Sequence, residues 1–470
     1  MRSGRAGRDL PGSVPGGSGR PCRAGRIGGH FAADPARCGG QGAGEARSWK
    51  VETAFYDALE ARDPAVREAA LMAALPGLIA AAKANCPAYR TRLAGIRPEV
   101  VTDLRALAEL PLTRKSELIG LQRDDPPFGG LAAVPLSSLR RVFVSPGPIY
   151  EPEGRRDDYG RFARALFAAG FRAGDLVHNA FSYHLSPAGA MVESAAAALG
   201  CPVVPAGTGQ TELQLRAIAD LRPVGYVGTP SFLKILFDRA AEQGLDITSL
   251  TKALVSAEAL PAALRRELRG RGVSVLQCYG TAEIGLIAYE CSGPDGEAES
   301  GMVLDEGIIL ELVRPGTGEP VAPGEIGEIV VTTTMTPEYP LIRFATGDLS
   351  RLLPDREVGP GCGRTNHRIA GWLGRADQTT KVRGMFVHPE QVADVLRRHP
   401  LVRQARLVVE RVAEADVMTL YIECGEEAGG LAPIADTMQR LTRLRGEVRR
   451  VAAGSLPKDG KLIEDRREVG

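Results

Sequence analysis

The sequence has no excess of charge of either sign, because 58 lysines and arginines are matched by 57 aspartates and glutamates among 470 residues. This balance gives no broad positive field, so we expect neither a nucleic-acid partner nor a membrane partner. Long apolar runs are also scarce. The run from Leu71 to Ala82 contains Pro76 and is followed by Lys83, and we expect no segment of the roughly 18–20 apolar residues that cross a bilayer.

No two cysteines form a CxxC pair. Scattered thiols in a chain of this length argue against a disulfide framework and are typical of a reducing compartment, so we expect a cytoplasmic protein. A hydrophobic share of 44% and a charged share of 24% are those of a globular protein. The length predicts two or three packed units.

Residues 1–49 lack apolar periodicity and are crowded with Gly, Arg, Pro and Ser. Such a segment buries too little apolar surface to offset the entropy lost on ordering. We interpret it as a disordered extension that carries no chemistry. Whether it belongs to the mature protein is left open.

The remaining chain changes its pattern twice. Short β-rich runs alternate with helical stretches, an alternation that favours a parallel sheet covered by helices on both faces. The runs are 142–144, 176–178, 203–204, 226–227, 254–255 and 273–276. After residue 300 the pattern indicates antiparallel strands at 307–313 and 325–334. Helices are expected at 64–84, 103–110, 158–169, 187–199, 212–221, 230–243, 261–269, 390–398 and 433–445, with two late strands at 405–410 and 417–423. The predicted fold class is α/β, with a large N-terminal domain and a small mobile α+β C-terminal domain.

Four short motifs follow one another in the second half of the chain. They read Y-G-T-A-E at Tyr279, T-G-D at Thr346, G-R-A-D-Q-T-T-K-V-R-G at Gly374 and L-P-K-D-G-K at Leu456. Each alone is a weak signal, since such strings arise in ordinary turns. Their order and spacing together resemble the adenylate-forming superfamily of acyl-CoA synthetases, adenylation domains and luciferases.

Three further stretches narrow the resemblance. They are T-R-K-S-E-L at Thr113, P-P-F-G-G-L at Pro126 and G-C-G-R-T at Gly361. These look like the phenylacetate–CoA ligase branch of the superfamily, and the resemblance covers the chain from about residue 53 to its end.

The resemblance implies an ATP-dependent, AMP-forming acid–thiol ligase. The carboxylate of a phenylacetate-like aromatic acid would attack the α-phosphate of ATP, giving an acyl-adenylate and pyrophosphate, and coenzyme A would then displace AMP. Catalysis of this kind is mostly positioning and electrostatic stabilisation. Two alternatives stay open: an enzyme that loads a carrier protein instead of CoA, and a non-catalytic nucleotide-binding homologue. A homodimer is also left open.

The resemblance further implies which residues bind the nucleotide. Tyr279 would present its ring to adenine, and Asp348 would accept hydrogen bonds from both ribose hydroxyls, a task that suits two carboxylate oxygens. Arg375 would support the ribose side. The full set of expected cofactor-binding residues is Ser256, Ala257, Glu258, Tyr279, Gly280, Thr281, Asp348, Arg375 and Gly384.

Catalytic roles carry over in the same way. Thr281 would lie beside the phosphates, and Glu283 would bind Mg²⁺, a hard cation that prefers carboxylate oxygen. Lys461 would reach the acid and the α-phosphate during adenylation and offset the charge that develops there. Lys458 is the nearby alternative.

The resemblance also predicts two working poses of one small domain. Asp377 would be the hinge, within a hinge segment 374–377 that joins an AMP-binding domain at 50–373 to a lid domain at 378–470. In the second pose Lys381 and Gly384 would face the thiol channel, where glycine leaves room for pantetheine.

The acid pocket is expected around Phe181, Tyr183, His184 and Gly207. Aromatic and small residues suit a flat arylacetate or benzoate-like acid. No residue in the sequence selects one acid. His184 has a second interpretation, as a buried hydrogen-bonded histidine of the core.

The sequence departs from the family's Ser/Thr/Gly-rich phosphate loop. Residues 145–152 read S-P-G-P-I-Y-E-P, in which Pro146 and Pro148 lack backbone donors and Glu151 adds like charge. The loop is therefore expected to hold phosphate poorly. Either Mg²⁺ and the lysines suffice, which we favour, or the protein is a weakened homologue.

Some relatives carry a zinc site near the positions of Cys291 and Cys362. The other expected cysteine and histidine ligands are missing here. Two ligands do not close a tetrahedral site, so we expect no zinc.

Overall fold

The computed structural model describes residues 54–354, 357–358, 361–383, 385–412, 415–425, 430–457 and 461–467. The chain divides into two units, Met1–Glu52 and Thr53–Gly470, and every described element belongs to the second. The expected disordered extension lies outside the described residues, as do Gly384 and Lys458. The helices are α1 (Pro64–Asn85), α2 (Pro87–Arg92), α3 (Leu104–Ala108), α4 (Leu118–Asp124), α5 (Ala163–Ala168), α6 (Ala188–Leu199), α7 (Thr211–Leu221), α8 (Pro230–Gln243), α9 (Ala262–Gly270), α10 (Pro389–Arg398) and α11 (Ala432–Thr442).

The strands gather into three larger sheets and two hairpins. They are β1 (Thr113–Arg114), β2 (Arg141–Ser145), β3 (Ile149–Glu153), β4 (Val177–Asn179), β5 (Val203–Pro205), β6 (Gly225–Gly228), β7 (Lys252–Val255), β8 (Ser274–Thr281), β9 (Gly285–Tyr289), β10 (Met302–Leu304), β11 (Ile308–Val313), β12 (Gly327–Thr333), β13 (Phe344–Ser350), β14 (Arg368–Ile369), β15 (Gly374–Arg375), β16 (Thr380–Val382), β17 (Met385–Val387), β18 (Val402–Val412), β19 (Ala415–Cys424), β20 (Glu447–Val451) and β21 (Ile463–Asp465). The mixed α/β fold class is confirmed.

The largest sheet has the order β14-β10-β9-β8-β7-β6-β4-β5. Its neighbours from β5 to β8 are parallel, and β8, β9, β10 and β14 continue it antiparallel. The predicted parallel sheet is thus confirmed for five strands. Parallel neighbours place the carboxyl ends of all five strands on one edge, where ligands bind in open α/β sheets.

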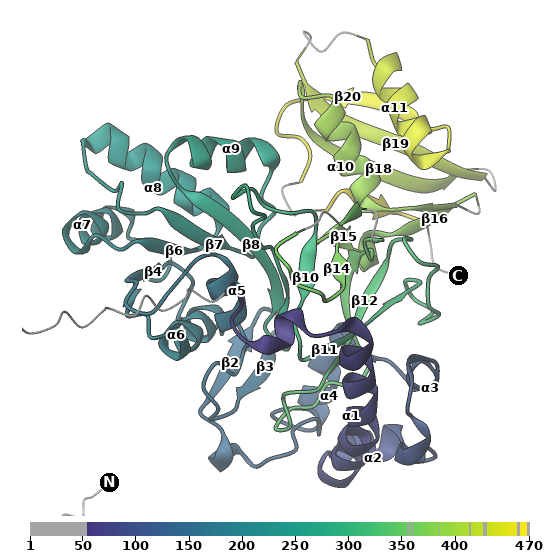
Figure 1. Ribbon diagram of the computed structural model, residues 1–470. Helices are drawn as coiled ribbons and strands as arrows, with labels where there is room; N and C mark the ends of the chain where they lie inside the picture. The colour runs from purple at the N-terminus through teal and green to yellow at the C-terminus, as the bar shows by residue number, and fades with distance from the viewer. Residues whose placement is uncertain are drawn as a thin grey trace, which may run out of the picture. The chain divides into compact units, whose positions relative to one another are not determined.

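Helices cover both faces of the parallel strands, as predicted (Figure 1). Side chains alternate between the faces along each strand. Val227 and Leu254 share a core with α5 and α6, whereas their neighbours Tyr226 and Ala253 share a second core with α7, α8 and α9. The near-continuous apolar runs in the sequence therefore reflect burial on both sides.

The helix predicted at 64–84 is α1, and it continues through Pro76. Among the described residues it is the one helix long and apolar enough to cross a membrane by length and composition, so the expectation of no such segment was wrong. Core helices pass the same test. Here Leu75 and Ile79 are fully buried in the core, and Arg67 pairs with Glu306 at 2.9 Å.

Three predicted helices are shorter than expected, and the one predicted at 103–110 is α3, Leu104–Ala108. The stretch predicted at 158–169 is helical only from Ala163, because Asp158 and Arg161 have positive φ values of 48° and 63°. The last helix ends at Thr442, since Arg443 adopts φ 60°. Left-handed backbone at ordinary residues ends a right-handed helix, and no sequence pattern marked these positions.

The second sheet has the order β1-β13-β12-β11, with β15 added beside β13. The antiparallel strands predicted at 307–313 and 325–334 are β11 and β12. Antiparallel pairing of β13 with β15 sets Asp348 opposite Arg375. This register joins two of the predicted nucleotide-binding motifs.

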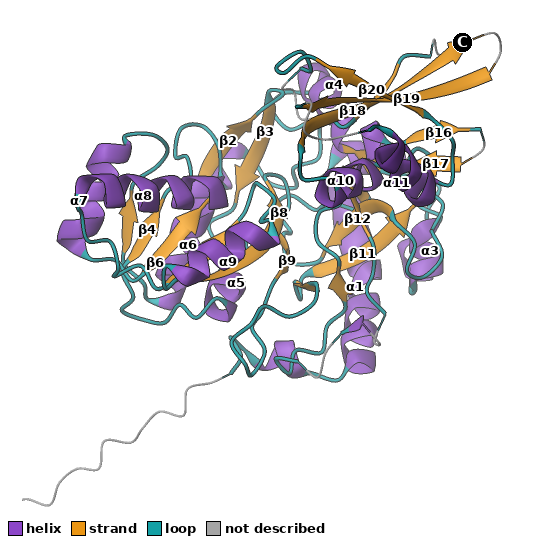
Figure 2. Cartoon of the chain, turned by 90° about the horizontal axis from the view of Figure 1, so that it is seen from above, coloured by secondary structure: helices purple, strands orange, loops and turns teal. Residues whose placement is uncertain are grey.

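The C-terminal residues form a sheet of order β20-β19-β18-β21, with α10 and α11 side by side against it (Figure 2). Its core contains only residues from Val382 onward, including Val392, Leu407 and Ile434. The α+β character predicted for this region is confirmed. The division at 374–377 and the mobility of the small domain stay predictions.

Candidate active site

Asp348 on β13 lies where two sheets meet and accepts three side-chain hydrogen bonds. The Tyr279 hydroxyl donates to Oδ2 at 2.8 Å, and Arg375 Nη1 and Trp372 Nε1 each donate to Oδ1 at 3.1 Å. The structure thus brings together the three residues predicted at the ribose and adenine. Trp372 was not among the predicted site residues. The feature that could have indicated it is its position, two residues before the motif that begins at Gly374.

The backbone at Gly347 allows Arg375 to approach Asp348. Gly347 has φ 77°, and a Cβ atom there would lie 2.7 Å from Arg375 Nη2. Glycine is therefore required both for the conformation and for the approach of the guanidinium. Burial, followed by the charge of Asp348, raises the pKa of Tyr279 well above its ordinary value, so its hydroxyl stays a donor.

A cavity of about 660 Å³ opens beside Asp348. The turn Ser256-Ala257-Glu258 follows β7, and Tyr279 is on the neighbouring parallel strand β8, so both reach the same edge of the sheet. Ser256 Oγ donates to the Cys278 carbonyl at 2.8 Å, which ties the turn to β8. The lining includes Ser256, Ala257, Glu258, Tyr279, Gly280, Met302, Asp348 and Trp372. The predicted adenine-binding residues therefore share one cavity, although the Tyr279 ring is only 7% exposed.

A second cavity, of about 440 Å³, is lined by Gly347 and Arg375 and by the basic pair Arg114 and Lys115. Arg114 pairs with Glu328 at 3.1 Å, and Lys115 Nζ lies 2.9 Å from Glu283 Oε1. Sequence reasoning used the T-R-K-S-E-L stretch only as a family marker and missed Lys115. The sequence feature that could have indicated Lys115 is the pair of adjacent basic residues, Arg114 and Lys115, within this motif.

Thr281 and Glu283 occupy the tight turn between β8 and β9. Gly280 and Gly285 make this turn close, since a Cβ on Gly280 would meet the Gly285 carbonyl oxygen at 2.5 Å. Thr281 Oγ1 accepts the Ile284 N–H at 3.3 Å. The Glu283 side chain is fully buried, and its partner is Lys115. A buried carboxylate at the predicted metal position fits a bound cation.

The atypical loop is the turn of the hairpin β2–β3. The Ser145 hydroxyl donates to Glu151 Oε1, so the one serine of the loop is engaged by a carboxylate. Burial raises the pKa of Glu151 to about 8, and the charge of Glu283 adds to this rise. Glu151, considered above only as a repulsive charge, therefore lies inside the protein near the predicted metal ligand.

Three of the four predicted acid-pocket residues contact Asn179, at the end of β4. Asn179 Nδ2 donates to the Tyr183 hydroxyl at 2.8 Å, Asn179 Oδ1 accepts the Phe181 N–H at 3.2 Å, and its carbonyl accepts the Gly207 N–H at 3.1 Å. Their role in acid binding stays a prediction.

His184 is exposed, so its interpretation as a buried core histidine was wrong. The fully buried histidine of this region is His178, whose Nε2 lies 2.8 Å from Gln214 Oε1. Burial lowers the pKa of His178. His178 is on strand β4, all three residues of which are buried, whereas His184 is in the loop beyond the strand.

The predicted lid residues are placed only in part. Lys461 is exposed and precedes β21, and its neighbour Leu462 donates from its backbone to Gln378 Oε1 at 2.8 Å. Asp377 lies in the short 3₁₀ helix Ala376–Gln378, and Lys381 lies in β16, but the side chains of both are outside the described residues. Their roles, and that of Gly384, stay predictions.

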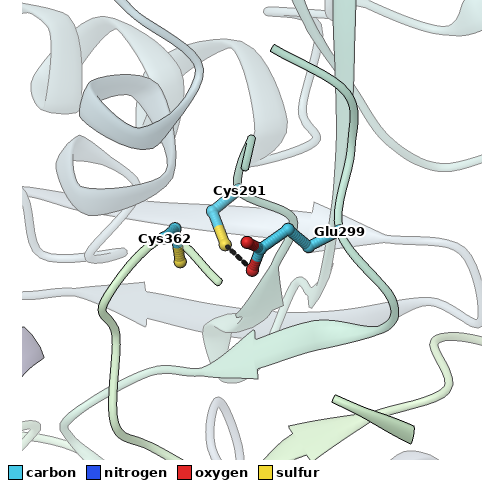
Figure 3. A group of neighbouring side chains, drawn as sticks. All are labelled: Cys291, Glu299 and Cys362. Carbon is cyan, nitrogen blue, oxygen red and sulfur yellow. Dashed lines mark hydrogen bonds between the residues drawn. The ribbon is translucent and has the colours of Figure 1, made fainter. Parts of the chain in front are cut away.

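Cys291, Glu299 and Cys362 form a separate group, with ligand atoms within 4.8 Å of one another (Figure 3). Arg368 Nη2 lies among them, 3.2 Å from each sulfur and 2.5 Å from Glu299 Oε2. A hydrogen bond from Cys291 and the nearby Arg364 charge lower the pKa of Cys362 to about 6. The sequence analysis missed Glu299 as a third group. Arg368 supplies positive charge to the group, and the expectation of no zinc stays a prediction.

Comparison with known proteins agrees with this geometry. The family of AMP-binding enzymes matches residues 187–339. Phenylacetate–coenzyme A ligases are 34% identical over 360 residues in Aromatoleum evansii, covering 73% of this chain and 78% of that one, and 35% identical over 367 residues in Thermus thermophilus, covering 75% and 80%. A 2-hydroxyisobutyryl-CoA ligase structure has a TM-score of 0.75 at 24% identity, covering 87% of this chain and 93% of that chain.

The fold and the cleft at Asp348 define an AMP-binding enzyme of the adenylate-forming class. Within that class, the chain belongs to the phenylacetate–coenzyme A ligase family. The resemblance drawn from the motifs is confirmed.

Proposed function

We propose that this protein is an ATP-dependent, AMP-forming ligase that activates an aromatic carboxylic acid of the phenylacetate type and transfers it to coenzyme A. Family membership supports the acid–CoA ligase class. The finer statements, on the acid and on CoA as acceptor, extend what the relatives' names say to this chain. A cytoplasmic location and small-molecule partners are part of the same proposal.

The observation that carries the proposal is the convergence of Tyr279, Trp372 and Arg375 on Asp348. A carboxylate offers about four acceptor positions, so one that receives three donors keeps capacity for a ribose hydroxyl. The cavities on either side, of about 660 and 440 Å³, give space for the base and for the phosphates. Mg²⁺ would bind at Glu283.

The proposed order of events follows from what each group can do. Asp348 and its neighbours orient the nucleotide, and Lys115 and Arg375 place positive charge at the cavity beside it. Lys461 brings a further ammonium to the reacting phosphate from the C-terminal region. Preorganised positive charge of this kind stabilises the transition state of acyl-adenylate formation. The acid would lie near Phe181, Tyr183 and Gly207.

The test is pyrophosphate release from ATP with a panel of aromatic acids, each with and without CoA. We expect release that depends on the acid, and an aryl-CoA thioester only when CoA is present. Release without thioester formation would favour a carrier protein as acceptor. Binding of ATP with no release for any acid would contradict the proposal and favour a non-catalytic homologue.

A further inference from the structure

Two buried carboxylates lie close together between the hairpin β2–β3 and the turn that follows β8. Glu283 has a fully buried side chain, and Glu151 is 2% exposed. Glu283 Oε2 and Glu151 Oε2 have no hydrogen-bond partner among the described residues. Buried polar atoms normally have a partner, so this group of oxygens indicates a missing one.

Among the described residues, the charges that act on Glu151 come from the Glu283 carboxylate and the Lys115 ammonium. This ammonium lies 2.9 Å from Glu283 Oε1. One lysine balances one of the two buried carboxylates, so the other must hold either a proton or a cation, because an uncompensated buried charge is costly. A small divalent cation would supply the missing charge and accept the unpartnered oxygens as ligands.

Glu151 is held in place rather than left to adjust. Gln122 Nε2 donates to the Tyr150 carbonyl, and the Tyr150 N–H donates to Gln122 Oε1, both at 2.8 Å. The Ser145 hydroxyl holds the other oxygen of Glu151. These contacts fix the strand and the side chain, so the unpartnered oxygen faces the interior in a defined position.

We propose that Glu151 and Glu283 together bind one divalent cation, Mg²⁺ in the cell, and that Lys115 occupies its place until it arrives. This inference rests on the proposed function, because the cation would serve the triphosphate of ATP. Mg²⁺ is typically held by one or two carboxylates together with phosphate oxygens and water. Lys115 also lines the 440 Å³ cavity, so the displaced ammonium can turn to phosphate there.

The proposal explains the altered phosphate loop. In place of backbone donors that hold the phosphates directly, this hairpin supplies a carboxylate that holds them through a metal. The prolines at 146 and 148 then do not weaken phosphate binding, since no backbone N–H from these positions is needed.

The experiment measures Mn²⁺ binding by electron paramagnetic resonance, with and without α,β-methylene-ATP, which cannot be adenylated. Glu151→Gln should weaken Mn²⁺ binding by at least about tenfold. The matched control is Glu153→Gln, a buried glutamate on the same strand whose partner is Arg141 at 2.8 Å. It should bind Mn²⁺ as the wild type does.

A second variant keeps the test decisive if Glu151→Gln does not fold. Lys115→Met removes the competing ammonium and should tighten Mn²⁺ binding in the absence of nucleotide. Wild-type Mn²⁺ affinity in a folded Glu151→Gln protein would overturn the proposal, as would weaker binding by Lys115→Met. Because Mn²⁺ binding needs no turnover, lost binding in Glu151→Gln supports the site even if no acid yields pyrophosphate, an outcome that would contradict only the proposed function.

Discussion

Asp348 is the side chain at which the proposed nucleotide-binding contacts converge. Its carboxylate is oriented by Tyr279, Trp372 and Arg375, which come from segments almost a hundred residues apart. Asp348→Ala should weaken ATP binding by roughly ten- to a hundredfold, because hydrogen bonds to a charged group contribute about 1.5–3 kcal/mol. Isothermal titration with ATP measures the change.

Trp372→Phe is the control for this prediction, since it removes one donor and leaves the carboxylate. We expect a loss of only a few-fold. Unchanged ATP affinity in a folded Asp348→Ala protein would contradict the assignment of the site.

At the residue scale, sequence reasoning found the side chains that short motifs mark. Tyr279, Asp348 and Arg375 stand in strings whose order is informative on its own. Lys115, Glu151 and Trp372 could not be assigned in this way, because their roles depend on contacts between segments distant in the chain. The ion pair of Lys115 with Glu283, for example, joins residues 168 positions apart.

Among the elements, the pairing of β13 with β15 depends on one glycine. Gly347→Ala should lower the melting temperature, since a left-handed conformation costs about 1–2 kcal/mol at an ordinary residue. It should also weaken ATP binding, because the new Cβ would displace Arg375 from Asp348. Thermal unfolding and ATP titration on the same samples measure both effects.

Gly324→Ala is the matched control. Gly324 has φ 83° and open space around it, so alanine there carries the conformational cost without a clash. It should lose stability but bind ATP as the wild type does. Equal ATP affinity in both variants would show that the approach of Arg375 to Gly347 does not matter for the nucleotide.

Elements with a strong periodic pattern could be predicted to within a few residues, as α6, α7, α8 and α9 illustrate. The hairpin β2–β3 was foreseen only as the single strand 142–144, because Pro148 and Pro152 argue against a second strand. Its pairing is nevertheless complete from Arg141 with Glu153 to Ser145 with Ile149. Tertiary packing of Glu151 and Ile149 decides this segment, and no local preference reveals it.

At the scale of the whole molecule, two half-reactions are assigned to two lysines. Lys461→Ala should abolish adenylation and spare thioester formation from a supplied acyl-adenylate, because its ammonium serves only the first step. Lys381→Ala should instead spare adenylation and impair thioester formation. Pyrophosphate release and thioester formation are measured separately, and an equal loss in both half-reactions for Lys461→Ala would rule out the role predicted for Lys461.

The hydrogen bond from Tyr279 to Asp348 has a consequence for the molecule as a whole. Tyr279 belongs to the eight-stranded sheet and Asp348 to the five-stranded one, so the carboxylate proposed to bind the ribose also links the two sheets. A nucleotide that binds there adds its free energy to the folded state by linkage. The free energy of unfolding should therefore rise with the concentration of ATP, and the contact between the two sheets should share in that rise.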